Sequence, residues 1–256
     1  MNETKRIHNL FKLYFFLIFG ALGMLVNYAP LYFKQINFSG TQISTILVLG
    51  SVALILVAPK YGLIFDTAKN KRNVLLVSIL VMAASLGTIG YFKAFIPILI
   101  LWVIYRIVNG PLYSISENLS YGVMTTQNNS FGGIRLWGSI GFAVAAWIGG
   151  WTYQLYGLQA NNLLFFTLMG LSALVLLRMP ASVFNVEKDP EERVFSLREV
   201  FKLIVDNRFL LLMALALAVS DPVQDGVRSF ENIYLENQGV KAGMIGLANM
   251  LSALTE

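Results

Sequence analysis

The sequence lacks cysteine and carries little charge, and each absence excludes a class of protein. None of its 256 residues is cysteine, so a disulfide, a thiolate zinc site or a cysteine nucleophile cannot form. The single histidine, His8, cannot build a histidine-rich metal site. Only 13% of the residues are charged, against about 25% in soluble domains, whereas 56% are hydrophobic. These proportions exclude both an ordinary soluble domain and a disordered chain.

Long apolar runs are what the sequence has instead. A helix needs about 20 apolar residues to cross the hydrocarbon core of a bilayer. Seven runs reach that length, which predicts an all-α polytopic membrane protein without a cleavable signal peptide. An eighth run begins near Ala242 but is too short to span before Glu256. The seven runs are Leu10–Phe33, Thr41–Phe65, Asn73–Phe92, Phe95–Met124, Ile134–Tyr156, Asn162–Met179 and Phe209–Tyr234.

The basic residues are distributed unequally between the two ends of these runs. If the N-terminus is cytoplasmic, 13 of the 19 Lys and Arg residues lie on the inside, 3 on the outside and 3 within runs. Positively charged loops favour the cytoplasmic side, so we expect a multi-pass plasma-membrane protein with a cytoplasmic N-terminus. The net charge of +5 is then explained by loop anchors, and nucleic acid is not an expected partner.

One long polar segment divides the chain. It separates six apolar runs from the beginning of another set, as at the midpoint of a six-plus-six transporter. The sequence Ser196-Leu197-Arg198-Glu199 fits a capping box and predicts a short amphipathic helix, either on the cytoplasmic membrane surface or as a solvated linker. We expect the chain to be the first part of a longer protein. The predicted segments are a six-helix bundle (1–179), a cytoplasmic linker (180–207) and the start of a second bundle (208–256).

A tight charged turn joins the second and third runs. It reads Gly62-Leu63-Ile64-Phe65-Asp66-Thr67-Ala68-Lys69-Asn70-Lys71-Arg72. Gly62 is expected to allow close helix approach, and Asp66 to accept hydrogen bonds or face a helix N-terminus. Lys71 and Arg72 should hold the loop at the cytoplasmic surface. A generic positively charged loop is the simpler interpretation.

The turn resembles the signature loop of the major facilitator superfamily, roughly G-x-x-x-D-x-x-G-x-R/K-R/K. Gly62, Asp66, Lys71 and Arg72 match this pattern, and Lys69 replaces the second glycine. In that family the loop latches the two halves together on the cytoplasmic side. The resemblance therefore implies a gating role for the four matching residues.

Two opposite charges lie in consecutive runs, at Glu117 and Arg135. An ionised group inside a bilayer helix costs about 2.5–3.5 kcal/mol on insertion scales, so such residues usually face a partner or a cavity. Arg106, Asn109 and Tyr113 share a related face of the fourth run with Glu117, and together they predict a polar stripe along a water-filled cleft. The alternative is that the pair only joins the two helices.

The segment that follows Arg135 narrows the resemblance. Arg135-Leu136-Trp137-Gly138-Ser139-Ile140-Gly141-Phe142 resembles the span-five motif of the lactose-permease-like branch, including its phenylpropionate-type permeases. In lactose permease a glutamate and an arginine that contact the sugar are also eighteen positions apart. The resemblance implies that Glu117 and Arg135 bind the solute and that Phe142 replaces a sugar-stacking tryptophan. A sugar other than a galactoside, a nucleoside and an aromatic acid fit equally well.

Two further patterns lie in the fifth and seventh runs. Gly141, Ala145 and Gly149 repeat every four residues, a small-residue stripe that predicts close helix packing. Asp221 and Asp225 share one face of the seventh run with Arg228. The two acids are candidates for proton coupling or charge-paired helix contacts, with local neutralisation by Arg228 as the alternative.

Together these patterns predict a secondary active transporter and no enzyme or cofactor site. The expected protein is a proton-coupled symporter of a small polar, aromatic-acid or sugar-like solute, monomeric at full length, which works by alternating access in a lipid bilayer. An efflux antiporter for metabolites or drugs is an alternative. A non-transporting membrane assembly or sensor protein is the alternative from a different class.

Overall fold

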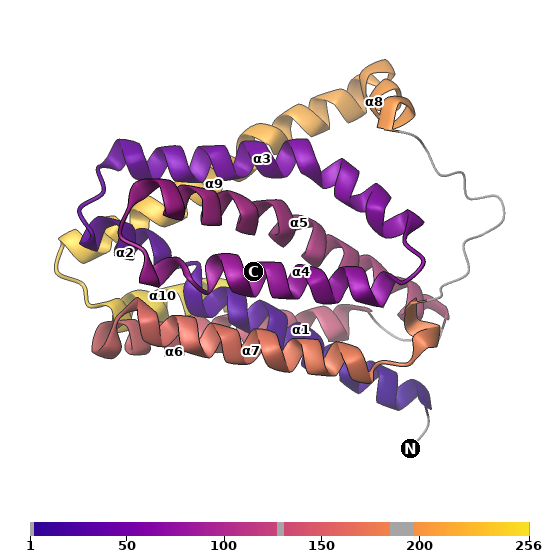
Figure 1. The fold of residues 1–256 in the computed structure, drawn as a ribbon, viewed down its shortest axis with the longest axis horizontal. Coiled ribbons are helices and arrows are strands. Elements are labelled where there is room, and N and C mark those ends of the chain that lie inside the picture. Colours follow the sequence, from indigo (N-terminus) through magenta and orange to yellow (C-terminus); the bar gives the residue numbers. More distant parts are fainter. Residues whose placement is uncertain (1–2, 127–130, 185–196, 256) are drawn as a thin grey trace.

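The computed structural model describes residues 3–126, 131–184 and 197–255, and every regular element in these ranges is helical (Figure 1). The predicted all-α fold is therefore confirmed. In chain order the elements are α1 (Glu3–Leu25), α2 (Ala29–Gln35), α3 (Gly40–Thr67), α4 (Lys71–Leu86), the 3-10 helix η1 (Ile89–Tyr91), α5 (Phe95–Thr126), α6 (Phe131–Tyr156), α7 (Leu158–Arg178), the 3-10 helix η2 (Ala181–Phe184), α8 (Leu197–Asp206), α9 (Arg208–Asn237) and α10 (Ala242–Thr255).

Six of the described segments are long and apolar enough to cross a membrane. They correspond to the first six predicted runs. The seventh run lies in α9, whose described apolar part, Arg208–Leu217, is shorter than a span. A membrane crossing by α9 therefore stays a prediction. The predicted eighth helix begins at Ala242 as expected.

The first span is broken, which the sequence analysis did not predict. Instead of one helix over Leu10–Phe33, α1 begins at Glu3 and ends at Leu25, and α2 begins at Ala29 after a turn. Pro30 lies in the first turn of α2. Proline has no N–H to donate, and its ring clashes with the carbonyl four residues before it, here that of Val26. The continuous helix is thus interrupted beside Asn27.

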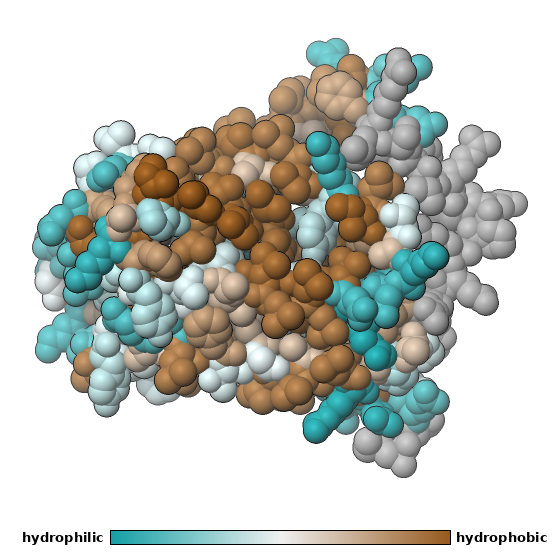
Figure 2. Space-filling model, in the orientation of Figure 1, coloured by the Kyte–Doolittle hydropathy of each residue, from teal (hydrophilic) through white to brown (hydrophobic). Residues whose placement is uncertain are grey.

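The surface matches a membrane environment. Leu56, Leu80 and Leu163 are 68%, 64% and 65% exposed, which is unfavourable in water but favourable against lipid. Figure 2 shows hydrophobic residues over the middle of the molecule and hydrophilic residues gathered toward its two ends. The same division is expected for a bundle of membrane-spanning helices.

The small-residue stripe of α6 brings this helix against α1. A Cβ at Gly149 would lie 2.9 Å from the carbonyl oxygen of Met24, and one at Gly141 would overlap the backbone of Phe16. From the α1 side, a Cβ at Gly23 would lie 2.5 Å from the carbonyl oxygen of Phe142. The predicted close packing is therefore confirmed. It places Arg135 and Phe142 of α6 beside the aromatic residues of α1.

Candidate functional site

An ion pair joins α5 to α6, two of the six spans. The Nε atom of Arg135 lies 2.8 Å from Oε1 of Glu117. Their side chains keep 41% and 34% exposure respectively, so both charges remain accessible. The guanidinium carbon of Arg135 also lies 4.5 Å from the ring centroid of Phe19 on α1, a cation–π arrangement. Three helices therefore fix one guanidinium group.

Tyr113 of α5 packs against Phe19 and holds it beside Arg135. Its ring centroid is 4.6 Å from that of Phe19, and its hydroxyl donates a 2.8 Å hydrogen bond to the carbonyl oxygen of Ile18. The side chain is buried and its hydroxyl is occupied by the main chain of α1. Tyr113 thus positions the Phe19 ring against the guanidinium group of Arg135.

A cavity of about 280 Å³ opens beside Arg135, between the six spans formed by α1–α7 and the helices α9 and α10. Its walls come from α1 and the α1–α2 turn, α6, α9 and α10. It brings together aromatic rings, amides, hydroxyls and charges of both signs, the mixture typical of a small-molecule site. The lining residues are Phe19, Leu22, Asn27, Arg135, Ser139, Phe142, Arg228, Glu231, Asn232, Leu235, Ala248, Asn249, Ser252 and Ala253.

The predicted polar stripe on α5 does not continue along this cavity. Arg106, Asn109, Tyr113 and Glu117 are not among its lining residues, although Glu117 contacts the lining residue Arg135 and Tyr113 contacts the lining residue Phe19. Nη2 of Arg106 lies 3.3 Å from the hydroxyl of Ser51 on α3. Helix α3 packs against α5, and Arg106 is directed to it rather than to the cavity.

The cavity contains three asparagines that the sequence analysis did not select. Nδ2 of Asn249 lies 3.5 Å from Oδ1 of Asn232, and Nδ2 of Asn232 donates a 3.2 Å hydrogen bond to the carbonyl oxygen of Asn27. We call Asn27, Asn232 and Asn249 the amide chain. Nδ2 of Asn27 is buried and has no hydrogen-bond partner among the described residues. A buried donor without a partner costs about 1–3 kcal/mol, which requires an explanation.

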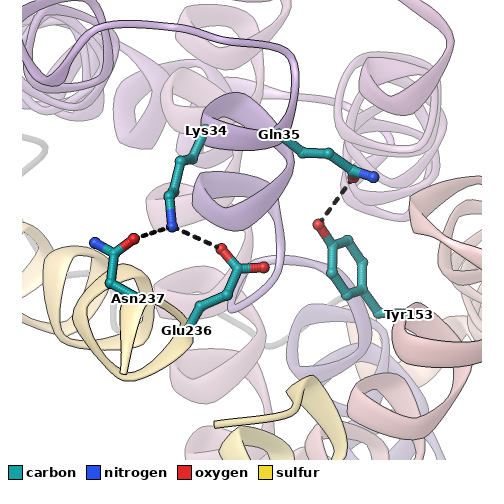
Figure 3. A network of polar contacts seen from close by, with 5 residues as sticks. All are labelled: Lys34, Gln35, Tyr153, Glu236 and Asn237. Atoms are coloured by element: carbon teal, nitrogen blue, oxygen red, sulfur yellow. Dashed lines mark hydrogen bonds and ion pairs between the residues drawn. The ribbon is translucent and has the colours of Figure 1, made fainter. Parts of the chain in front are cut away.

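Beyond the amide chain, polar contacts join α2 to α9 and to α6 at one end of the molecule. Nζ of Lys34 on α2 lies 3.3 Å from Oε2 of Glu236 on α9 and also donates to Oδ1 of Asn237 (Figure 3). The hydroxyl of Tyr153 on α6 donates a 3.2 Å hydrogen bond to Oε1 of Gln35 on α2 (Figure 3). We call the residues Lys34, Gln35, Tyr153, Glu236 and Asn237 the polar closure.

The backbones of α6 and α10 also meet at this end. A Cβ at Gly150 would lie 2.5 Å from the carbonyl oxygen of Ala242, and one at Gly246 would lie 2.8 Å from that of Ala146. The backbone N–H of Gly243 donates a 3.1 Å hydrogen bond to Oε1 of Gln154. The first half of the chain is therefore in direct contact with α9 and α10.

The signature-like loop lies at the opposite end of α3 from the polar closure (Figure 1). Nη2 of Arg72 donates a 2.6 Å hydrogen bond to the carbonyl oxygen of Met179, and its guanidinium carbon lies 4.9 Å from the ring centroid of Phe184. Nζ of Lys71 lies 5.6 Å from the ring centroid of Phe65. The loop is thus tied to the end of α7 and to η2.

The predicted role of Gly62 in close helix packing is wrong for this arrangement. A Cβ at Gly62 would meet nothing within 4 Å. No neighbour among the described residues therefore requires the absence of a side chain at this position. Asp66 is exposed and has an interaction partner.

The acids proposed for proton coupling are not placed by the structure. Asp221 and Asp225 belong to α9, but their side chains lie outside the part of the chain that the structure describes. Arg228, on the same helix, lines the cavity. Ser196, the predicted cap of α8, lies outside the described residues. Within the described ranges, no group of three or more His, Asp or Glu side chains could hold a metal ion.

Known proteins resemble this chain over nearly its whole length. The model of the MFS_1 like family matches residues 8–256. A maltose permease from Geobacillus stearothermophilus is 27% identical over 253 residues, which cover 96% of this chain and 61% of the permease. The uncharacterized transporter YwbF from Bacillus subtilis (strain 168) is 23% identical, over 99% of this chain and 62% of that protein. The chain therefore spans less than two thirds of these relatives.

A solved structure shares the fold. The chain superimposes on a crystal structure of a mutant of the nucleoside transporter NupG with a TM-score of 0.76 and 17% sequence identity. The match covers 96% of this chain and 64% of NupG. At this identity the likeness establishes the arrangement of the helices.

Proposed function

The chain belongs to the MFS_1 like family, and from this membership we propose that the whole protein takes up a small polar solute together with protons. It is a multi-pass membrane transporter of the major facilitator type and not an enzyme. The observation that carries the proposal is the cavity beside Arg135, whose walls come from both halves of the fold. A solute held there would contact two bundles that can rock against each other.

Arg135 is the proposed anchor for the solute. Its pairing with Glu117 and its place over Phe19 fix the guanidinium plane, and Arg offers several donors in one planar fork. Glu117 orients this fork and neutralises its charge. Phe142 supplies an apolar wall for a ring. The maltose permease and NupG carry a sugar and nucleosides by name, and both kinds of molecule combine a ring with hydroxyl groups.

The arrangement of contacts corresponds to one state of the transport cycle. With a cytoplasmic N-terminus, as the positive charges favour, the polar closure faces outside and the loop around Asp66 faces the cytoplasm. The cavity would then be closed toward the outside. Asp221 or Asp225 is the proposed proton-coupling group, because removal from water raises the proton affinity of a carboxylate.

Uptake into proteoliposomes tests the proposal. The protein is produced from its complete coding sequence and reconstituted, and maltose and uridine are offered at a range of pH gradients. A symporter should alkalinise the solution from which the solute is taken, and an inward proton gradient should accelerate uptake. Acidification of the solution from which the solute is taken would favour the efflux antiporter, because an antiporter moves protons in the direction opposite to the solute. No movement of any solute, with or without a gradient, would contradict transport.

A further inference from the structure

We propose that the amide chain is a specificity subsite that accepts an uncharged hydroxyl or carbonyl group and rejects a carboxylate. The inference rests on the proposed transport function and deepens it. All three asparagines line the cavity, and they lie between Arg135 and the polar closure. They come from three separate segments, namely the α1–α2 turn, α9 and α10.

The side-chain amide of Asn27 provides a hydrogen-bond donor for the solute. Its Nδ2 is buried without a hydrogen bond among the described residues, although Asn27 borders the cavity. Buried polar groups in native proteins are nearly always satisfied, so an unsatisfied one beside a cavity indicates a missing acceptor. A hydroxyl or carbonyl oxygen of a solute is an acceptor of the right kind.

The helix break beside Pro30 explains why the main-chain carbonyl of Asn27 is available at the cavity. The break between Leu25 and Ala29 removes Asn27 from a regular helix, and the carbonyl oxygen of Asn27 accepts from Asn232. Interrupted helices within membrane proteins place backbone and side-chain polar groups at cavities. The break therefore gives the cavity one main-chain acceptor, which Asn232 already occupies, and the side chain of Asn27 adds the donor.

The charges around the cavity do not favour an anion. The described charged residues of its lining are Arg135, Arg228 and Glu231, and Arg135 is paired with Glu117 outside the lining. These four groups sum to zero. An incoming carboxylate would lose its hydration without a net positive charge to replace it, which is unfavourable in a medium of low dielectric constant. A hydroxyl group, which both donates and accepts, matches amides without this cost.

The same amide chain is part of the contact between the two halves. The bond from Asn232 to Asn27 joins α9 to the first half, and the Lys34–Glu236 pair lies one helical turn further along α9. A solute bound to Asn27 would therefore lie directly on the seam that has to open toward the outside. Recognition of the solute and the contact between the two halves would then share Asn27 and Asn232.

The test compares three probes on the purified full-length protein in detergent. Uridine and maltose are the uncharged probes, and 3-phenylpropionate is the carboxylate probe. Binding is followed by protection of a single cysteine, introduced as Ser252→Cys in a cysteine-free background, against a maleimide. Ser252 lines the cavity, so an occupied site should slow its labelling.

In the parent protein at least one uncharged probe should protect the cysteine and 3-phenylpropionate should not. Asn27→Ala and Asn232→Ala should each weaken binding of the protecting probe about three- to tenfold, the loss of one hydrogen bond. Asn73→Ala is the matched control, because Asn73 is exposed on α4 and should leave binding unchanged. If Asn27→Ala does not fold, Asn249→Ala tests the same chain.

Three outcomes would overturn the proposal: tighter binding of 3-phenylpropionate than of both uncharged probes, no protection by either uncharged probe, or unchanged binding in the asparagine variants. The transport function is judged separately from labelling of the same cysteine from each side of the membrane. Access from both sides with no bound probe would support alternating access even if the amide chain failed as a subsite.

Discussion

The ammonium group of Lys34 lies 3.3 Å from the carboxylate of Glu236, although 202 positions separate the two residues in the chain. Lys34 lies near the end of α2, the second part of the broken first span, and Glu236 lies near the end of α9. Their contact therefore joins the two halves of the fold. Both side chains are about one third exposed, and an ion pair of this kind contributes about 0.2–1 kcal/mol. Such a weak contact can be broken at a small cost in free energy, as the proposed alternation between states requires.

Reversal of one of these charges should open this end of the molecule, which the proposed orientation places outside. Lys34→Glu places two carboxylates together, and we expect labelling of a cysteine at position 252 from outside to accelerate about 1.5- to fivefold. The double variant Lys34→Glu/Glu236→Lys should return labelling toward the parent rate. High salt should reduce the effect, because exposed charges are screened. Equal rates in all three proteins would exclude a gating role for the pair.

Removal of the Arg135 fork should abolish transport. Arg135→Lys keeps the charge but loses the planar donor arrangement, and it weakens the stacking on Phe19. Glu117→Gln removes the charge that pairs with Arg135 at 2.8 Å. We expect at least a tenfold loss of uptake in each variant, with membrane insertion and thermal stability largely retained. Uptake at the parent rate in either variant would reduce the pair to a contact between α5 and α6.

The loop at the opposite end should influence cycling more than binding. Asp66→Asn keeps the size of the side chain but removes its charge, and Asp66 is not among the residues that line the cavity. We expect a several-fold lower rate of uptake with an unchanged affinity in the cysteine-protection assay. Arg72→Gln should behave similarly, because it loses the hydrogen bond to Met179 and the contact with Phe184. A large loss of affinity with normal turnover would contradict the latch role.

The sequence predicts those features that depend on composition and on neighbouring elements. The six spans follow from apolar runs, and the pairing of Glu117 with Arg135 follows from opposite charges in consecutive helices. The α1–α6 contact follows from the spacing of Gly141 and Gly149. Each of these is a local pattern or a contact between elements that the chain order brings together.

The remaining features depend on tertiary packing that no local pattern contains. Asn27 and Asn232 are uncharged and 205 positions apart, so neither their cost in a membrane nor their spacing distinguishes them. The break at Pro30 lies inside an apolar run, and one proline does not determine whether a helix bends or ends. Arg106 shares a face with Glu117, but only the position of α3 decides that Ser51 occupies it.

The close contact between α6 and α10 gives the sharpest test of the outer closure. Gly150 and Gly246 lie where a Cβ would meet the carbonyl oxygens of Ala242 and Ala146 at 2.5 and 2.8 Å, so alanine at either position must push the helices apart. The strain exists only while the halves touch at this end. Gly150→Ala and Gly246→Ala should therefore favour the state that is open to the outside.

The measurement is again cysteine labelling at position 252 from outside, together with uptake. We expect several-fold faster labelling and slower uptake in Gly150→Ala and Gly246→Ala. Both variants should remain folded at the temperature of the assay, as a thermal unfolding curve would show. Gly170→Ala on α7 is the control, since a Cβ there meets nothing within 4 Å. Because Gly→Ala also stiffens the unfolded chain, the control separates that effect from a displaced helix. If the control and the two test variants label equally fast, the α6–α10 contact does not close the outer end.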